Sequence, residues 1–230
     1  MQRLLDVSSS IAATLMRGAQ GMRVRRLGPR PAEPVTLYEF ESCPFCRKVR
    51  EALTVLDLEA DVLPCPKGGT RFRPEVVARG GKAQFPYLVD PNTGKEMYES
   101  DAIVSYLFAE YGEGPPPPAL LGGFAAVTGS LASALRLGLG TTAEPSRLPA
   151  EPLELWSFEA SPFSRIVREK LCTLELPYRL HNVGKGSPSR AAFVARSQKM
   201  QVPYLVDPNT GAALFESAEI VAYLDATYRL

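Results

Sequence analysis

Hydrophobic residues in the first half of the chain change their spacing where one predicted element gives way to the next. The stretch 35–40, VTLYEF, predicts a strand. After a short turn, Val49, Leu53 and Leu56 recur at helical spacing, which predicts a helix that starts at about Pro44. A strand followed at once by an amphipathic helix is typical of an α/β protein.

The same pattern predicts the elements that follow. A short strand near Val62 and a helix at about 75–79 come next. PYLVD then predicts a strand, PNTG a hairpin turn and MYES the second strand of the hairpin. We expect Ser100 to cap a final helix, whose apolar face is formed by Ile103, Leu107 and Tyr111. The predicted order, β-α-β-α-β-β-α, is that of the thioredoxin fold.

The whole pattern then occurs a second time. Alignment of Pro34 with Pro152 places ESCPFCRKVRE beside EASPFSRIVRE, FPYLVDPNTG beside VPYLVDPNTG, and YESDAIVSYL beside FESAEIVAYL. Similarity of this kind at a fixed separation indicates a duplicated structural unit. We therefore predict two tandem thioredoxin-fold domains, which we call unit 1 (34–111) and unit 2 (152–230).

Residues 112–151 are predicted to link the two units. Four consecutive prolines near the start favour an extended, stiff spacer. The apolar segment that follows is marginal in length for a membrane helix, is rich in Gly and Ser, and is followed directly by Arg136. We therefore expect a packed helix and no transmembrane span, and weak membrane association stays open.

The extension at 1–33 has two interpretations. It is rich in Arg and Ser and poor in acids, which is the composition of an organelle transit peptide. Its segment SSSIAATLMRGAQG also resembles TGSLASALRLGLG, which lies a similar distance before unit 2. That similarity favours a short helix belonging to each repeat.

Composition narrows the classes of function. The chain has 230 residues, of which 45% are hydrophobic and 22% charged, and its formal net charge is +1. This is the balance of a globular protein and gives no charge field for nucleic acid. Four cysteines do not form the dense pattern of a small secreted scaffold, so a reducing compartment fits better.

The Cys43–Cys46 motif, CPFC, is the main candidate for chemistry. A sulfur just before the helix that Pro44 begins faces free backbone N–H groups and the positive end of the helix dipole, which favour thiolate. We expect Arg47 to add a nearby positive charge, so Cys43 is the predicted nucleophile. Cys46, one turn later and less exposed, can attack a mixed disulfide at Cys43.

Two other interpretations of the pair are weaker. A zinc site needs four ligands, and the chain offers no second C-x-x-C pair and a single histidine, His181, so we predict no metal site. Two buried cysteines without a task are also compatible with the motif, although the position beside Pro44 disfavours this.

At this point unit 1 resembles glutaredoxins and the N-terminal domain of glutathione S-transferases. The resemblance rests on CPFC at the first helix, on QFPYLVD with a proline expected to be cis, and on YESDAIVSYL at the last helix. CPFC followed by KVRE is also similar to prostaglandin E synthase type 2. The tandem arrangement resembles plant and algal plastid proteins with two such domains, which implies a chloroplast location, with the cytoplasm as the alternative.

The resemblance implies a glutathione site in unit 1. The peptide bond before Pro86 would be cis, facing Cys43, and the backbone of Phe85 would pair with glutathione. Glu99 and Ser100 would bind its γ-glutamyl end, and a carboxylate at a helix N-terminus is physically favourable. Lys82 is a candidate for the glycine carboxylate. As structural alternatives, Ser100 is a helix cap, Glu99 a solvated charge and Pro86 a turn residue.

Unit 2 keeps the matching positions but not the sulfurs. Ser161 stands where unit 1 has Cys43, and a serine hydroxyl neither ionises near neutral pH nor forms a disulfide, so we predict that unit 2 is redox-inactive. A second glutathione site is possible there, and its residues would be Ser161, Val202, Pro203, Glu216 and Ser217. A structural or docking role for unit 2 ranks above it.

The chain departs from the transferases in one respect, because a linker and a second unit stand where those enzymes have a large helical domain.

The leading hypothesis is a glutathione-linked thiol–disulfide oxidoreductase or thiol transferase acting on a protein or small-molecule disulfide. The rival is a non-enzymatic module that binds glutathione or, less favourably given the second cysteine, an iron–sulfur cluster. A narrower alternative, isomerisation of a lipid peroxide, rests on CPFC-KVRE alone.

Overall fold

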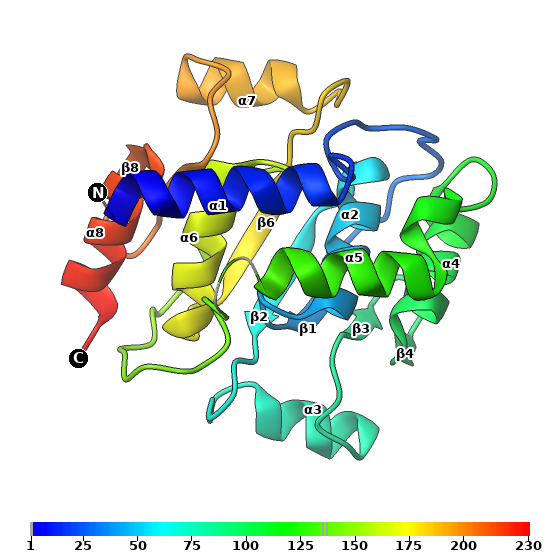
Figure 1. Ribbon diagram of the computed structural model, residues 1–230, viewed down its shortest axis with the longest axis horizontal. Coiled ribbons are helices and arrows are strands. Elements are labelled where there is room, and N and C mark those ends of the chain that lie inside the picture. Colours follow the sequence, from blue (N-terminus) through cyan, green and yellow to red (C-terminus); the bar gives the residue numbers. More distant parts are fainter. Residues whose placement is uncertain (1, 135, 137) are drawn as a thin grey trace.

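The computed structural model describes residues 2–134, 136 and 138–230 (Figure 1). Both units have the order β-α-β-α-β-β-α, as predicted. The elements of unit 1 are β1 (Val35–Glu39), α2 (Pro44–Val55), β2 (Ala60–Pro64), α3 (Arg73–Gly80), β3 (Tyr87–Asp90), β4 (Lys95–Met97) and α4 (Ser100–Tyr111). Those of unit 2 are β5 (Leu153–Ser157), α6 (Pro162–Thr173), β6 (Tyr178–Asn182), α7 (Arg190–Ser197), β7 (Tyr204–Asp207), β8 (Ala212–Phe215) and α8 (Ser217–Tyr228).

The two units share one eight-stranded sheet with the order β4-β3-β1-β2-β6-β5-β7-β8. They meet where β2 pairs antiparallel with β6, in the register Ala60 with Leu180 and Val62 with Tyr178. A free edge strand exposes unpaired backbone groups, and this pairing removes one such edge from each unit. A single apolar core cluster includes buried residues of both units, so they pack as one body.

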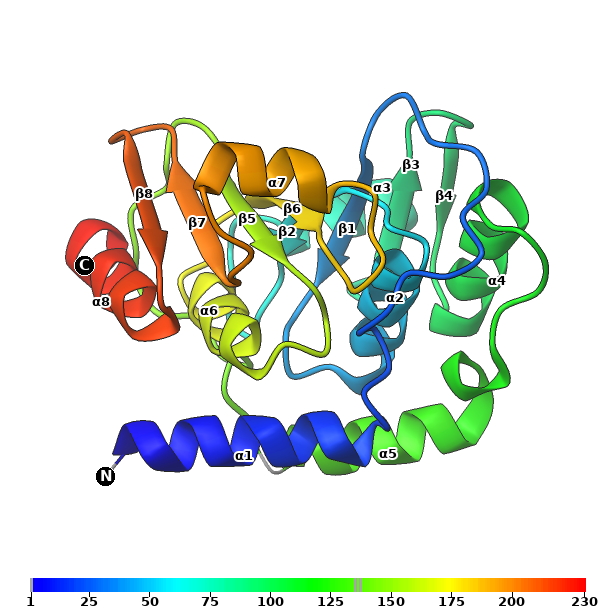
Figure 2. The same cartoon turned by 90° about the horizontal axis from the view of Figure 1, so that it is seen from above.

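Two further helices form an outer layer beside α2 and α6. They are α1 (Gln2–Met16) and α5 (Gly122–Ala134), and the short 3₁₀ helix η1 (Pro118–Leu120) leads into α5. In Figure 2 they lie in one layer below α2 and α6. No helix within the described ranges is long and apolar enough to cross a membrane.

Each outer helix packs against the unit that does not follow it. α1 precedes unit 1 but contacts α6 of unit 2, while α5 precedes unit 2 but contacts α2 of unit 1, and the two also contact each other. Small or short residues allow the close approach. A Cβ added to Gly129 would lie 3.1 Å from the Cβ of Pro44, and the Ser10 hydroxyl donates to the Pro162 carbonyl over 2.8 Å. The helix expected for each repeat is therefore exchanged between the units.

A buried ionic cluster lies between α2 and α6. Arg50 donates to Glu159 across the units over 3.0 Å, and Arg168 donates to Glu41 over 3.1 Å in the reciprocal direction. Both arginine side chains are 1% exposed. Recurrence of an arginine at this place in both copies therefore reflects contact between the units, and not pairing at the surface.

Candidate functional site

The loop after β1 places Cys43 at the N-cap of α2. Its backbone is extended (φ −72°, ψ 120°), and its Sγ accepts a hydrogen bond from the Cys46 backbone N–H over 3.3 Å. Pro44 occupies the first turn, where its missing N–H leaves no donor unpaired. The pKa of the Cys43 thiol is lowered, chiefly by the hydrogen bond from the Cys46 thiol and, against burial, by the backbone N–H groups of Cys46 and Phe45.

The second cysteine has the opposite character. Cys46 is fully buried, and burial together with its interaction with Cys43 raises its pKa well above the ordinary value. Cys43 is thus the sulfur that is more readily ionised, while Cys46 holds its proton until Cys43 has reacted. This difference matches the division of labour expected for a nucleophile and a resolving thiol.

The structure corrects the expected role of Arg47. Its side chain is buried and turns toward the cluster between the units, where its Nε lies 3.7 Å from Glu159. Arg47 is not among the leading influences on the pKa of Cys43. The reason is that the Arg47 guanidinium lies beside Glu159 of unit 2, so its charge belongs to the cluster between the units.

Cys43 is less accessible than an exposed nucleophile, because the residue is only 3% exposed. Phe45 beside it is 48% exposed, and Phe85 packs edge-on against Phe40 at 6.2 Å between ring centroids. The α5 helix crosses over Pro44, the next residue in the chain. Cys43 therefore has little exposed surface, and α5 packs against the residue that follows it.

The residues implied for glutathione in unit 1 stand on two other elements. The Phe85–Pro86 peptide bond is cis, as expected, and precedes β3. Glu99 and Ser100 lie at the start of α4, and Glu99 has a positive φ of 67°, a conformation that few non-glycine residues adopt. Gln84 donates to the Glu99 carboxylate over 2.5 Å.

One detail of this group differs from the sequence expectation. Ser100 is the first residue of α4, whose N-cap is Glu99 and has no side-chain cap bond, so Ser100 does not cap the helix. The physical reason is the positive φ of Glu99, which breaks the helical conformation one residue earlier than expected. Lys82 is exposed, and its Nζ lies 4.8 Å over the Tyr98 ring.

Unit 2 reproduces the backbone geometry without the thiols. Ser161 is the N-cap of α6, and its hydroxyl accepts from the Ser164 backbone N–H over 3.2 Å and from the Ser164 hydroxyl over 2.9 Å. The Val202–Pro203 bond is also cis, and Glu216 has a φ of 62° just before Ser217 begins α8. Unit 2 has thus kept the same backbone geometry around the hydroxyl groups of Ser161 and Ser164.

Two features near the site were missed by the sequence reasoning. Gln84 recurs as Gln201, which donates to Glu216 over 2.5 Å, and the repeat alignment could have found this pair. Glu39 is a buried carboxylate found only in unit 1, where unit 2 has Ser157. Burial, only partly offset by Arg50, raises the pKa of Glu39 to about 7. Its partner Arg50 lies on the helix that follows, and no short motif joins the two, so the sequence alone did not single Glu39 out.

The other two cysteines do not join the site. All four cysteines are free thiols. Burial raises the pKa values of Cys65 and Cys172, and the Cys172 thiol donates to the Gly140 carbonyl over 3.2 Å. No group of three or more His, Cys, Asp or Glu residues suited to a metal occurs in the part of the chain that the structure describes.

With the fold and the site in place, comparison with known proteins identifies the class. The family "Glutathione S-transferase, N-terminal domain" matches residues 37–116 and 155–230, which are most of the chain. The protein therefore belongs to this family and contains two copies of its domain. The family is glutathione-related, and the two matched ranges correspond to units 1 and 2.

Individual relatives are similar over smaller parts. The glutathione S-transferase-like protein tpcF of Aspergillus fumigatus is 34% identical over 79 residues, which are 34% of this chain and 34% of that protein. The glutathione transferase BmGSTD1 of Bombyx mori is 29% identical with a TM-score of 0.34, over 37% of this chain and 39% of the other. Leishmania TDR1, a trimeric glutathione transferase, is 16% identical with a TM-score of 0.30, over 84% and 68%. The chain spans about a third of the curated relative.

Proposed function

We propose that the protein is a glutathione-linked thiol–disulfide oxidoreductase or thiol transferase, in which unit 1 carries the chemistry. The observation that carries the proposal is the opposite perturbation of the two CPFC thiols, with the pKa of Cys43 lowered and that of Cys46 raised. In a dithiol of this kind, one sulfur acts as the nucleophile and the other stays protonated until it attacks the mixed disulfide.

The proposed reaction starts when the Cys43 thiolate attacks a substrate disulfide. One substrate sulfur forms a mixed disulfide with Cys43, and the other leaves as a thiolate that takes a proton from solvent. Cys46 then loses its proton and attacks the Cys43 sulfur, which releases the second substrate thiol and leaves an intramolecular disulfide. Two glutathione molecules reduce this disulfide, and they leave as oxidised glutathione.

Glutathione would bind between the turn before β3 and the N-terminus of α4. The Phe85 backbone and the cis-Pro86 turn would hold its cysteinyl part, and the N-terminus of α4 at Glu99 and Ser100 would receive the γ-glutamyl carboxylate. Lys82 remains the candidate for the glycine carboxylate. Unit 2 has no thiol at Ser161 and is proposed to act as scaffold, through the shared sheet and the ionic cluster.

The test is the reduction of a glutathionylated peptide by glutathione, coupled to glutathione reductase and NADPH. Cys43→Ser should abolish turnover, because the nucleophile is lost. Cys46→Ser should keep partial, monothiol activity on this substrate. Ser161→Ala, the matched change in unit 2, should leave the rate unchanged. Full activity of Cys43→Ser would refute the proposal.

A second candidate is a non-enzymatic module that holds glutathione or an iron–sulfur cluster as a fixed ligand. The observation that favours it is the 3% exposure of Cys43, which limits access by large substrates. The two candidates differ in the protein as purified under anaerobic conditions. Stoichiometric bound glutathione or iron together with no turnover would favour the module. A chloroplast location, suggested by the resemblance alone, is part of the proposal and is tested by fractionation.

A further inference from the structure

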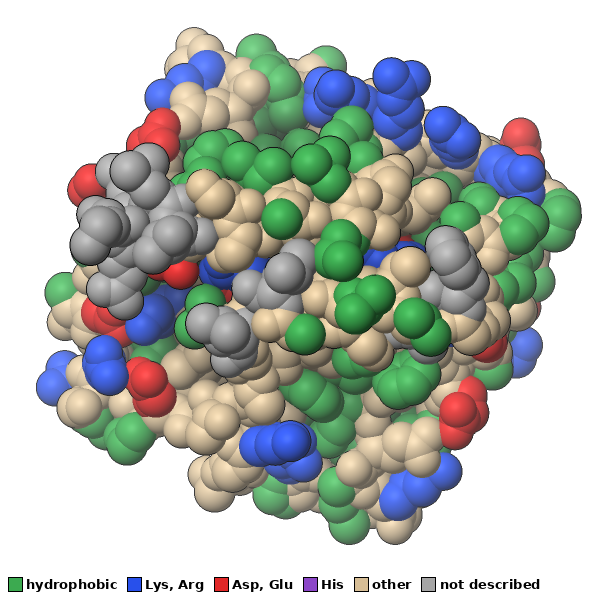
Figure 3. Space-filling model, viewed as in Figure 1, with side chains coloured by type: hydrophobic (Ala, Val, Ile, Leu, Met, Phe, Trp, Pro, Cys, Tyr) green, Lys and Arg blue, Asp and Glu red, His purple; other side chains and the backbone are tan. Residues whose placement is uncertain are grey.

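The outer face of the α1 and α5 pair carries exposed apolar side chains. The chain has no charged residue between Val7 and Met16 or anywhere in α5. Figure 3 shows this face, with apolar side chains along the helix pair. The large exposed apolar residues of the pair, with their exposed fractions, are Ile11 (41%), Leu15 (70%), Met16 (43%), Val127 (59%) and Leu131 (49%).

These side chains are not needed to attach the helices to the protein. The inward positions of the pair are small or hydroxyl-bearing residues, among them Ser10, Ala13 and Ala132, which are fully buried. The outward residues therefore stay in water although the inner face already secures the layer. A contiguous apolar patch of this kind marks an interaction surface in most proteins.

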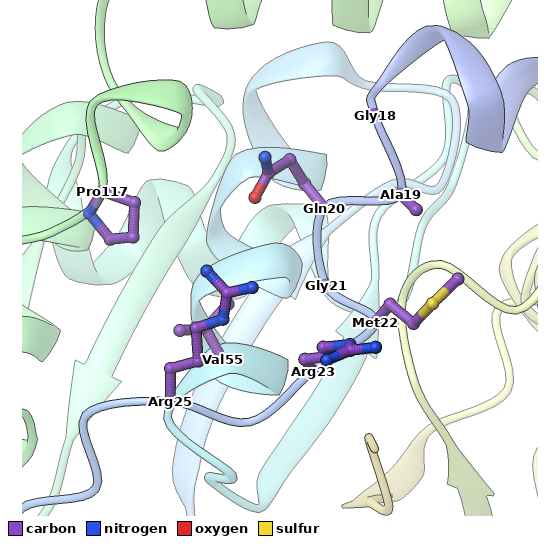
Figure 4. A pocket seen from close by; sticks show the side chains of 9 residues that line it. All are labelled: Gly18, Ala19, Gln20, Gly21, Met22, Arg23, Arg25, Val55 and Pro117. Carbon is purple, nitrogen blue, oxygen red and sulfur yellow. The ribbon is translucent and has the colours of Figure 1, made fainter. Parts of the chain in front are cut away.

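Positive charge lies in the segment 23–25, which follows α1 and runs past the end of α2. α1 is followed by the exposed residues Arg23 and Arg25, which line a cavity of about 230 Å³ together with the turn at 18–21 (Figure 4). Within the described residues neither arginine has a carboxylate partner. Other exposed arginines do have one, such as Arg79 with Glu75 and Arg196 with Glu154.

We propose that the α1 and α5 face docks on an anionic lipid surface, with Arg23 and Arg25 contacting headgroup phosphates. Two helices side by side in one layer present a broad platform, which suits the plane of a bilayer (Figure 2). An uncharged apolar helix surface that meets the headgroup boundary beside arginines is the pattern of interfacial binding. The arginines supply the charge complementarity, because anionic headgroups attract basic residues near the surface.

The orientation follows from the charges at the ends of the pair. Asp6, at the start of α1, is 44% exposed on its side chain and lies 3.9 Å from Arg136, so this end carries a local acid–base pair. At the opposite end, Arg23 and Arg25 have no carboxylate partner among the described residues, while the exposed Asp101 beside the start of α5 is already paired with Lys48. We therefore expect the arginine end to lie deeper among the headgroups than the Asp6 end.

The test is flotation of the full chain with vesicles of phosphatidylcholine containing a third phosphatidylglycerol, and with vesicles of phosphatidylcholine alone. We expect binding to the first composition, weakened by 0.5 M salt, and little binding to the second. Arg23→Ser with Arg25→Ser should lower the partition coefficient about thirtyfold, at about fivefold for each arginine. Leu15→Ser with Leu131→Ser should lower it at least about tenfold.

A matched control lies elsewhere on the surface. Leu148 is 56% exposed and Arg147 beside it is exposed, so the double change Arg147→Ser with Leu148→Ser alters the same residue types outside the proposed face. This control should bind as the unchanged protein does. The proposal is overturned if the protein does not bind anionic vesicles, or if the control lowers binding as much as the face variants.

A second copy of the chain is the competing occupant. Light scattering after size exclusion distinguishes it, because a monomer has a mass of 25.1 kDa. We expect the unchanged protein to be monomeric at micromolar concentration without lipid. A dimer that Leu15→Ser with Leu131→Ser converts to monomer would overturn the lipid proposal and assign the face to self-association.

Discussion

Glu159 is a buried carboxylate that lies beside three arginines between the two units. Its oxygens lie 2.8 Å from Arg168 Nη2, 3.0 Å from Arg50 Nε and 3.7 Å from Arg47 Nε, and its side chain is 3% exposed. Burial raises its pKa, but the arginines outweigh burial and lower it from 4.5 to about 2. At about 1.4 kcal/mol per pKa unit, folding favours the charged form of Glu159 over its protonated form by about 3 kcal/mol relative to the unfolded chain.

We therefore expect Glu159→Gln to lower the free energy of unfolding by about 3 kcal/mol at pH 7, because the amide leaves buried arginines without their counter-charge. The folded pKa lies below the unfolded one. The contribution is thus fully present above pH 4.5 and is lost as the pH falls from 4.5 to about 2. The difference between the variant and the unchanged protein should shrink over that window.

Glu39→Gln is the matched control, because Glu39 lies in the same cluster and its pKa is shifted in the opposite direction, to about 7. A folded pKa above the unfolded one gives stability that is present below pH 4.5 and is lost as the pH rises to about 7. Glu39→Gln should therefore be at least as stable as the unchanged protein above pH 7.

Urea unfolding followed by the fluorescence of Trp156, the single tryptophan, and by circular dichroism measures both variants. The two probes should report one transition, because the units share a sheet and a core. A loss below about 1 kcal/mol for Glu159→Gln at pH 7, or equal losses for the two variants, would refute the reasoning about the cluster.

The remaining predictions concern the CPFC motif. Cys46→Ala should raise the pH midpoint of Cys43 alkylation, because the hydrogen bond from the Cys46 thiol is the largest influence that lowers the pKa of Cys43. Cys46→Ser, which keeps a hydrogen-bond donor, should raise the midpoint less. An equal midpoint in both variants would show that the hydrogen bond is unimportant. Gly129→Leu should speed the alkylation of Cys43, because a side chain at position 129 meets Pro44 and pushes α5 away from the site. Gly123→Leu is the control, because a side chain at position 123 meets open space. An unchanged rate in Gly129→Leu would show that α5 does not limit access to Cys43.

Local pattern and repetition were enough to predict the fold of each unit. The element order and the hairpin follow from short segments whose chemistry is local, whereas the cis bond before Pro86 is expected from the family resemblance. The position of Cys43 at a helix N-terminus follows in the same way, since Pro44 marks the start of the helix. These features depend on neighbours within one turn or one strand.

Contacts between distant segments could not be predicted in this way. The sequence RKVRE in α2 has the charge density of a solvated helix, yet Arg50 and Glu51 are buried against Glu159 and Arg17. These partners lie 109 and 34 residues away in the sequence, so a local pattern could not reveal them. The pairing of β2 with β6 is equally distant. A pattern of periodicity identifies which face of an element is apolar, but it does not identify the segment that covers a charged face.

The exchange of α1 and α5 between the units has the same cause. The similarity of their sequences indicates that a helix precedes each unit, but it does not indicate which unit the helix contacts. The contact is decided by small residues, Gly129 against Pro44 and Ser10 against Pro162, which any helix of this composition would offer. Only the three-dimensional arrangement distinguishes packing within a repeat from packing between repeats.

The pH dependence of Cys43 alkylation in the reduced protein, followed by the mass of its peptide with and without glutathione, tests the central claim most directly. A lowered pKa and a glutathione site beside the sulfur predict a midpoint below that of a free cysteine and protection by glutathione, with Cys46 unmodified in the folded protein. A midpoint equal to that of a free cysteine, without protection by glutathione, would contradict the account.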